Sequence, residues 1–340
     1  KENVESRLVI KTRRKPYWQV KSGPFTQADF RALPKTHWTL LVQDTDKHVP
    51  VLAALLDHFR FIPNWRIDDL MISYAADGGS VGPHMDAYDV FLLQAQGTRR
   101  WEISTRPHRE ADIPGLELRQ VRAFTAQQDW LLQPGDMLYL PPGVAHHGVA
   151  VGACMTFSIG FRAPTDAEML ADLSGLLLER AGREARYSDP DLVPADADPG
   201  RIPLPARRAI RQRLRSTLQL DDVALDEWFG RFITEPKPWI DPQPLRRPLT
   251  AAALNRKLKT AGSLERDAAA ILAWFPAGRN GIKLFVNGCC HPLPARLAPL
   301  ARLLCRQRRY PRKRLAQHLR YAQAPRLLVD LYNRGVLYFP

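Results

Sequence analysis

The feature that most constrains the fold is a series of short apolar segments between residues 7 and 161, separated by turns that contain Gly or Pro. Arg7–Lys11, Trp38–Gln43 and Ala153–Phe161 are examples, and each contains β-branched or aromatic residues. Segments of this length and composition are typical of β-strands. Many short strands joined by tight turns predict an antiparallel barrel or a double-sheet jelly roll.

Three local expectations follow from this region. A helix at 50–59 interrupts the strands, because apolar residues recur there at helical spacing. The polar stretch 44–48 is expected to be a loop. Val90–Gln94 and Arg99–Ile103 are expected to be separate strands, with a turn at Gly97 between them.

Beyond Pro164 the apolar spacing changes from that of strands to that of helices. Helices are expected at 166–183, with Thr165 as the N-cap, and at 206–220 and 223–234.

The proline-rich stretch 236–248 is expected to be a linker. After it, a hairpin within 271–286 and helices around 295–307, 312–320 and 325–334 indicate a winged-helix-like unit.

The composition is that of a soluble globular protein, with 45% hydrophobic and 25% charged residues. No apolar run is long enough to span a bilayer and no signal peptide is recognisable, so membrane association is not expected. The four cysteines form no Cys-x-x-Cys pair, and a cytoplasmic location is expected. Because the chain begins with Lys1 rather than Met, we expect the native N-terminus to lie upstream.

The net charge of +14 is concentrated in residues 241–340, which contain 19 Lys and Arg against 4 Asp and Glu. Residues 1–165 are close to neutral. A winged-helix-like unit with this charge could bind nucleic acid. A basic run such as Arg306–Arg314 is more often a solvated helix face, however, so direct nucleic-acid binding is not expected.

The strongest chemical signal lies in Gly78–Gln94, where a Gly-Pro turn precedes His84-x-Asp86 and an apolar run. Alternate side chains of an extended chain point to the same face, so His84 and Asp86 are predicted to point together. A third ligand follows the Pro-Pro-Gly turn, at His146 or His147, and His146 is preferred because consecutive extended residues cannot both face inward. Two histidines and one carboxylate form the facial triad of non-haem Fe(II) enzymes.

An oxygenase with this triad uses a keto acid, whose far carboxylate needs a cation. Arg99 and Arg100 are both candidates, because alternation places only one of them inside the barrel. A guanidinium matches a carboxylate through two hydrogen bonds. Ser73 and Tyr74, on the strand before the Gly-rich turn, could add a hydroxyl.

Four longer stretches around these residues carry a family resemblance: Trp65–Tyr74, Gly82–Phe91, Asp136–Gly143 and Phe157–Pro164. They resemble the JmjC branch of the 2-oxoglutarate oxygenases, and within it the bacterial ribosomal oxygenases. The resemblance is dense over 1–165 and thins after the linker.

The resemblance implies an α+β fold with three domains. These are a JmjC/cupin-type double-stranded β-helix (jelly roll) at 1–165, a helical dimerisation region at 166–240 and a winged-helix-like domain at 241–340.

The resemblance also implies an activity, the hydroxylation of an arginine side chain of the 50S ribosomal protein sixteen by a homodimeric dioxygenase that converts 2-oxoglutarate and O2 to succinate and CO2. The site residues that it implies are His84, Asp86 and His146 for Fe(II), with Arg99 rather than Arg100 and Ser73 for 2-oxoglutarate.

Other functions remain compatible with the residues. They are a JmjC lysine demethylase, a cupin-like metal enzyme without a keto acid, and a basic ribosome-binding or nucleic-acid-binding protein with an inert barrel. For a hydroxylase of arginine, Asp44, Asp46, Asp77 and Asp89 are candidates to receive the guanidinium, on charge and sequence proximity alone.

Overall fold

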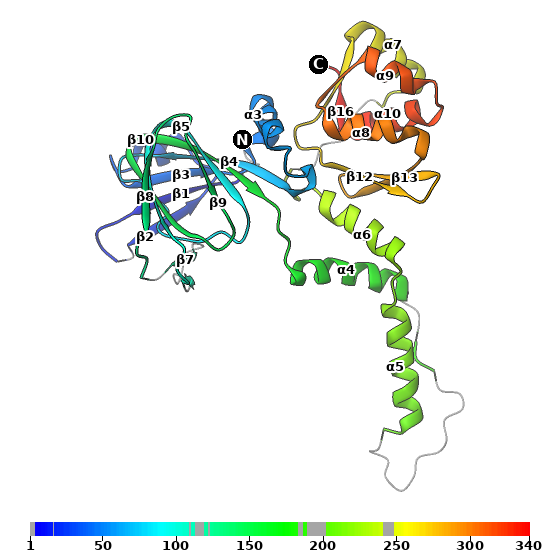
Figure 1. Ribbon diagram of the computed structural model, residues 1–340, viewed down its shortest axis with the longest axis horizontal. Helices are drawn as coiled ribbons and strands as arrows, with labels where there is room; N and C mark the ends of the chain where they lie inside the picture. The colour runs from blue at the N-terminus through cyan, green and yellow to red at the C-terminus, as the bar shows by residue number, and fades with distance from the viewer. Residues whose placement is uncertain are drawn as a thin grey trace.

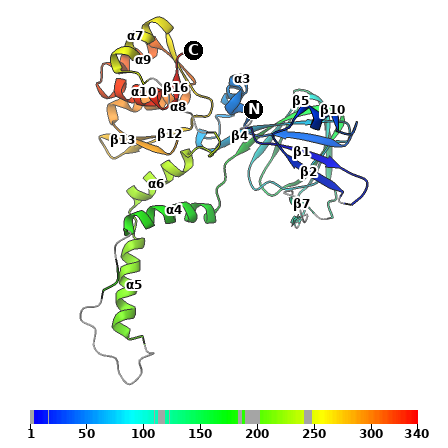
Figure 2. The same ribbon diagram turned by 180° about the vertical axis from the view of Figure 1, so that it is seen from behind.

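A computed structural model describes residues 4–15, 17–108, 110–112, 119–121, 123–182, 186–188, 202–240 and 248–340. Figure 1 shows a β-barrel at one side and a mixed C-terminal domain at the other, joined by α4 (Asp166–Ala181) and α6 (Asp222–Thr234). Helix α5 (Leu204–Leu218) projects away from both bodies, as the reverse view in Figure 2 also shows.

The barrel is an antiparallel sheet with the strand order β2-β1-β3-β4-β10-β5-β8, and β9 also pairs with β5. This arrangement confirms the predicted jelly-roll class. The bounds are β1 (Ser6–Lys11), β2 (Trp18–Ser22), α1 (Gln27–Arg31), β3 (Trp38–Val42), η2 (Asn64–Arg66), β4 (Ile67–Ala75), β5 (Val90–Ser104), β6 (Glu110–Asp112), β7 (Arg119–Val121), β8 (Gln128–Leu132), β9 (Met137–Leu140) and β10 (Ala145–Phe161).

The expectation of a turn at Gly97 is wrong, because β5 runs through it as one strand. Gly97 has a φ of 63°, and a Cβ there would collide with the carbonyl oxygen of Ala153. Opposite it, the pairing of β10 shifts register between Val151 and Met155. Gly97 therefore forms part of a bulge that bends the strand pair without ending it.

The predicted helix at 50–59 is confirmed as α3 (Pro50–Leu55) followed by η1 (Leu56–Phe59). Its buried side chains pack on Leu70 and Phe161, and each such side chain contributes about 1.5–3 kcal/mol when it leaves water. The expectation of a loop at 44–48 is wrong, since Thr45–His48 forms the short helix α2, with Asp44 in a left-handed conformation before it.

The helices between the two bodies expose much of their apolar surface. Thr165 caps α4 through a capping box with Glu168, as the sequence predicts for the N-cap. Neither α4 nor α5 has a buried residue. None of the helices in the described ranges is long and apolar enough to cross a membrane.

The C-terminal domain surrounds its own core, which includes Leu254, Leu258, Tyr310 and Leu328. The predicted hairpin is confirmed, but the sequence does not predict the first helix, which buries only two leucines. The bounds are α7 (Ala251–Ala261), β11 (Ser263–Arg266), β12 (Leu272–Ala277), β13 (Gly281–Val286), β14 (Cys289–Pro294), η3 (Ala295–Leu297), α8 (Ala298–Arg306), β15 (Arg309–Pro311), α9 (Arg312–Leu319), α10 (Gln323–Asn333) and β16 (Leu337–Tyr338).

Candidate metal centre

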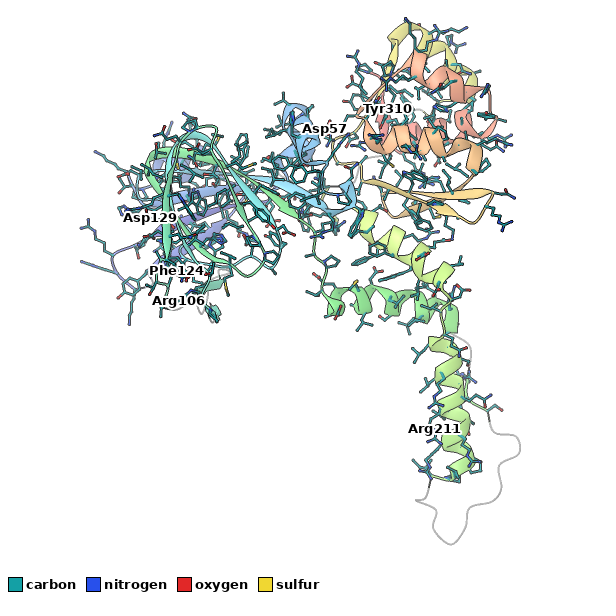
Figure 3. The ribbon with its side chains drawn as sticks, viewed as in Figure 1. Asp57, Arg106, Phe124, Asp129, Arg211 and Tyr310 are labelled. Carbon is teal, nitrogen blue, oxygen red and sulfur yellow. The ribbon has the colours of Figure 1, made fainter. Side chains whose placement is uncertain are left out.

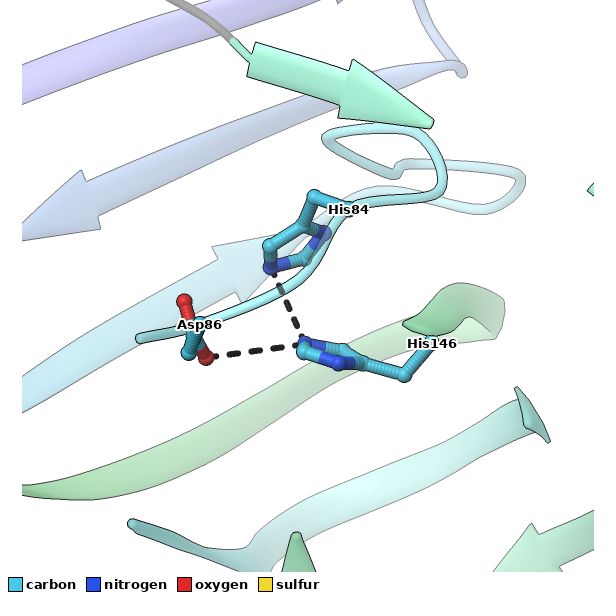
Figure 4. Close-up of side chains that lie close together, drawn as sticks. All are labelled: His84, Asp86 and His146. Atoms are coloured by element: carbon cyan, nitrogen blue, oxygen red, sulfur yellow. Dashed lines mark hydrogen bonds and ion pairs between the residues drawn. The ribbon is translucent and has the colours of Figure 1, made fainter. Parts of the chain in front are cut away.

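The side chains of His84, Asp86 and His146 converge on one point inside the barrel (Figure 4). The two histidine Nε2 atoms lie 3.1 Å apart, and Asp86 Oδ2 lies 3.7 Å from His146 Nε2. One ligand atom from each of the three residues lies within 4.8 Å of the others. In the described part of the chain, this is the one cluster of His, Cys, Asp and Glu side chains with the spacing of a metal site.

Backbone pairing between two distant segments holds these residues. His84 follows the Gly-Pro turn and forms an isolated bridge with His146, in which each N–H donates to the other carbonyl oxygen at 2.9 Å. Two residues on, the carbonyl oxygen of Asp86 accepts from the Gly143 N–H at 2.8 Å. The bridge and this hydrogen bond together fix the spacing of the candidate ligands.

Neighbouring carbonyl groups orient both imidazole rings. His84 Nδ1 lies 3.0 Å from Gly82 O, and His146 Nδ1 lies 3.0 Å from Val144 O. A carbonyl oxygen only accepts, so Nδ1 carries the proton and Nε2 keeps its lone pair toward the shared point. Burial, followed by the nearby His84, lowers the pKa of His146 to about 3, so this ring is neutral at physiological pH.

This donor set fits a divalent transition metal. Imidazole nitrogen binds such ions at about 2.0–2.1 Å, so two ligands at right angles lie roughly 3 Å apart. The observed separation of 3.1 Å between the two Nε2 atoms agrees with that value. Two nitrogens and one carboxylate oxygen are the donors of non-haem Fe(II) sites, which keep the remaining positions open.

The three residues line a cavity of about 270 Å³ that also contains Arg99. Arg99 is only 3% exposed, and its guanidinium contacts Ser73 Oγ at 3.4 Å, Gly148 O at 3.3 Å and the side chain of Cys154. Arg99 Nε has no hydrogen-bond partner among the residues that the structure describes. Burial lowers the pKa of Arg99, and no carboxylate of the described residues pairs with it.

A buried cation without a counter-ion costs several kcal/mol, and an anion that enters the cavity removes that cost. The Arg99 fork matches a carboxylate, and the Ser73 hydroxyl lies beside it to donate a further hydrogen bond. Trp101 stacks on the guanidinium at 5.0 Å and is 4% exposed, so it keeps water from this part of the cavity. The cavity therefore combines three side chains suited to binding a metal ion with an arginine and a serine suited to binding a carboxylate.

The structure separates candidates that the sequence leaves side by side. Arg100 points to the outer face, where its Nε donates to Asp129 Oδ2 at 2.6 Å. His147 Nδ1 lies 2.9 Å from Glu102 Oε2 and does not line the cavity. Tyr74 does not line the cavity either.

Asp69 is a cavity residue that the sequence reasoning misses. It is 7% exposed, and burial raises its pKa to about 7. One of its oxygens accepts from the Asp44 N–H at 2.9 Å. The signal was present in the strand alternation, because Asp69 stands four residues before Ser73 and therefore on the same face of β4.

The four acids chosen for their sequence proximity, Asp44, Asp46, Asp77 and Asp89, are not in the cavity lining. Each already has another partner in the structure. The partners are, in the same order, Lys237, Lys47, the Gly152 N–H and Arg66. Among the described residues, Asp69 and Asp86 are the carboxylates that line the cavity, so the structure favours them over these four acids.

The barrel and its triad define the class of the protein, a JmjC-type metal-dependent oxygenase. In agreement, the family model described as JmjC domain matches residues 54–169. The model described as ROXA-like winged helix matches residues 213–338.

Known relatives specify the family. The chain is 38% identical to the ribosomal protein uL16 3-hydroxylase of Escherichia coli (strain K12), across 84% of this chain and 74% of that protein. It is 38% identical to the probable ribosomal oxygenase of Haemophilus influenzae, across 58% of this chain and 47% of that protein. The structure of YcfD, a ribosomal oxygenase from Escherichia coli, in complex with cobalt and 2-oxoglutarate has a TM-score of 0.80 and 33% identity, over 100% of this chain and 87% of that chain. This chain belongs to the family of bacterial ribosomal oxygenases.

Proposed function

We propose that this protein is an Fe(II)- and 2-oxoglutarate-dependent dioxygenase that hydroxylates an arginine side chain of ribosomal protein uL16, the 50S protein sixteen. The observation that carries the proposal is Arg99, which is buried without a partner carboxylate among the described residues and shares its cavity with the His84, Asp86 and His146 cluster. A metal and a carboxylate ligand together account for both features.

In this proposal His84, Asp86 and His146 hold Fe(II), while Arg99 and Ser73 bind the far carboxylate of 2-oxoglutarate. When bound, the iron supplies the oxidative decarboxylation of 2-oxoglutarate to succinate and the hydroxylation of an unactivated C–H bond. The protein orients the reactants. The two histidine rings present Nε2, the Arg99 fork fixes the co-substrate, and Trp101 excludes water from the guanidinium.

We assign the recognition of the substrate guanidinium to Asp69. Of the two carboxylates in the cavity, Asp86 is committed to the metal, which leaves Asp69 as the counter-ion for a basic side chain. Its raised pKa reflects a buried carboxylate that a guanidinium would stabilise in the charged form. Tyr88 and Ser158 line the same cavity and are available to contact the aliphatic part of the substrate side chain.

The direct test is incubation with Fe(II), 2-oxoglutarate, O2 and purified uL16, followed by intact-mass and fragment-ion spectrometry. We expect a gain of one oxygen atom on an arginine and stoichiometric succinate, both absent in His84→Ala. Loss of a methyl group from a lysine substrate instead would favour the demethylase alternative. Succinate-independent turnover would favour a metal enzyme without a keto acid.

We also propose three domains, at 1–165, 166–240 and 241–340, and a cytoplasmic homodimer that forms through the middle one. The support is the apolar surface of the helices, which is exposed in the single chain. The exposed residues include Leu170, Leu178, Ile210, Leu214, Leu218 and Val223.

A further inference from the structure

A basic cleft of about 840 Å³ lies between the barrel and the C-terminal domain and shares no lining residue with the cavity of the metal cluster among the residues that the structure describes. Arg60 enters it just after η1, Arg302 and Arg306 come from α8, and Arg314 comes from α9. Among the residues that the structure describes, no Asp or Glu lines this cleft. The remaining lining residues are Asn64, Pro299, Leu303, Gln307, Gln317 and His318.

The arginines of this cleft have few partners of their own. Within the described ranges, Arg306 and Arg314 are exposed and form no ion pair, and Arg302 stacks on the Trp274 ring at 5.6 Å. Arg60 alone is paired, at 2.7 Å to Asp57. Three guanidinium groups are therefore free to bind an external anion.

A second, narrower cavity of about 60 Å³ continues the cleft inward, since Arg60 and Asn64 line both. Arg266 and Arg308 line this inner part. Arg266 is 7% exposed; its Nη1 donates to Leu304 O at 3.4 Å, and its Nε has no hydrogen-bond partner in the described part of the chain. Arg308 shares the carboxylate of Asp57 with Arg60, at 3.0 Å (Figure 3 labels Asp57 at the junction of the two bodies).

The positive charge of the inner cavity therefore exceeds what its own acids neutralise. Its other carboxylates, Asp46 and Asp68, pair with Lys47 and Lys237, which leaves Arg266 without a partner carboxylate. Burial lowers the pKa of Arg308, and the neighbouring Arg266 lowers it further. An unpartnered buried guanidinium at the end of an arginine-lined cleft is the arrangement expected of a phosphate receptor.

We propose that this cleft binds the phosphate backbone of RNA. Its open shape and its arginines, which come from two domains, suit a chain of phosphates better than a single enclosed ion. The proposal departs from the sequence-based expectation of a solvated helix face, because the arginines face a shared cleft. The choice of RNA as the source of phosphate rests on the proposed function, since ribosomal proteins bind ribosomal RNA.

The test measures the binding of a fluorescein-labelled single-stranded RNA to the full chain by anisotropy, at several KCl concentrations and without iron or 2-oxoglutarate. For single strands, the logarithm of the binding constant falls with the logarithm of the salt concentration by about 0.7 per phosphate neutralised, so the three free arginines predict a slope of roughly −2. The double variant Arg306→Ala, Arg314→Ala should reduce the slope by about 1.4 and weaken binding at every salt concentration. An unchanged slope and affinity would overturn the proposal.

The matched control is Arg256→Ala with Lys259→Ala, which removes the same charge from exposed positions of α7 that line neither cavity. We expect this control to keep the RNA affinity and slope of the unmodified chain. An equal loss in both double variants would show diffuse attraction to the whole domain and overturn the assignment to the cleft.

Two further measurements distinguish RNA from inorganic phosphate as the ligand, and RNA binding from hydroxylation. Titration calorimetry with inorganic phosphate should give far weaker binding than RNA, and tight phosphate binding without RNA binding would overturn the RNA assignment. Hydroxylation of isolated uL16 should be unchanged in Arg306→Ala, Arg314→Ala. Because RNA binding is measured without iron, its failure is distinguishable from a failure of the hydroxylase proposal.

Discussion

At the residue scale, Arg99 is a guanidinium that the fold buries without giving it a partner carboxylate. Replacing it by Met should lower the affinity for 2-oxoglutarate by roughly 10–100-fold, because charged hydrogen bonds contribute about 1.5–3 kcal/mol. The measurement is the KM for 2-oxoglutarate, with the exposed Arg100→Met as the control.

The same substitution should have the opposite effect on stability. A buried, unpaired charge costs folding free energy, so Arg99→Met should raise the free energy of unfolding of the protein without ligand. Urea unfolding of both forms provides the comparison, and a destabilised Arg99→Met would show that Arg99 is satisfied within the fold itself.

In its proposed role as the counter-ion of the substrate guanidinium, Asp69 should make substrate binding sensitive to pH. Its pKa is raised from 3.8 to about 7, so its carboxylate is charged above that pH and protonated below it. The KM for a uL16 arginine peptide should therefore rise as the pH falls through about 7, and Asp69→Asn should raise the KM and flatten this profile. The KM for 2-oxoglutarate should stay unchanged, which distinguishes loss of peptide binding from damage to the cavity.

The raised pKa of Asp69 also makes the stability of the fold depend on pH. A carboxyl group whose pKa is higher in the folded state stabilises the fold fully below its unfolded pKa, and that stabilisation disappears as the pH rises through about 7. At pH 8 without substrate, Asp69→Asn should therefore unfold at a higher urea concentration than the unmodified protein.

The histidine pair His146-His147 offers an internal control for metal binding. Co²⁺ should raise the thermal midpoint of the unmodified protein and of His147→Ala, because a metal that binds only the folded state stabilises it. Co²⁺ should not raise the thermal midpoint of His146→Ala, because this substitution removes one of the three candidate ligands. A cobalt response that is lost equally in both variants would contradict the preference for His146.

At the element scale, the pairing of β5 with β10 positions Arg99, the proposed ligand of the 2-oxoglutarate carboxylate. Gly148 of β10 stands opposite Trp101, and a Cβ there would come within 2.6 Å of Arg99 Nε and 2.7 Å of the Trp101 ring. Gly148→Ala should therefore displace Arg99 and raise the KM for 2-oxoglutarate. Gly175→Ala on α4 meets nothing within 4 Å and should leave it unchanged, with a gain in stability of at most about 1 kcal/mol.

On β5, strand alternation explains which predictions from the sequence were correct and which were not. It correctly separates Arg99 from Arg100, since neighbours on β5 face opposite sides. It did not reveal that Gly97 lies within a strand, because a glycine that forms a bulge and a glycine that forms a turn look alike in a sequence. The bulge depends on close packing against Ala153, which lies far along the chain.

At the scale of the whole molecule, the projecting helix α5 has no core of its own. Ile210, Leu214 and Leu218 follow one another at a spacing of four residues and are exposed. In the proposed homodimer they are covered, so Leu214→Lys with Leu218→Lys should convert the dimer to a monomer in light scattering after size exclusion. Gln212→Lys, on the same helix, should leave the mass unchanged.

The sequence by itself determined the strand series, the change to helices after Pro164 and the identity of the three metal-type residues. The strand series, the change to helices and the His84-x-Asp86 pair are properties of local spacing, and the Pro-Pro-Gly turn indicates His146, which the bridge to His84 then brings to the pair. The tertiary structure alone decided that Asp69 enters the cavity, that Arg99 has no partner carboxylate, and that arginines of two domains share one cleft. Burial and pairing are relations between residues far apart in the chain, so they appear only when the fold brings those residues together.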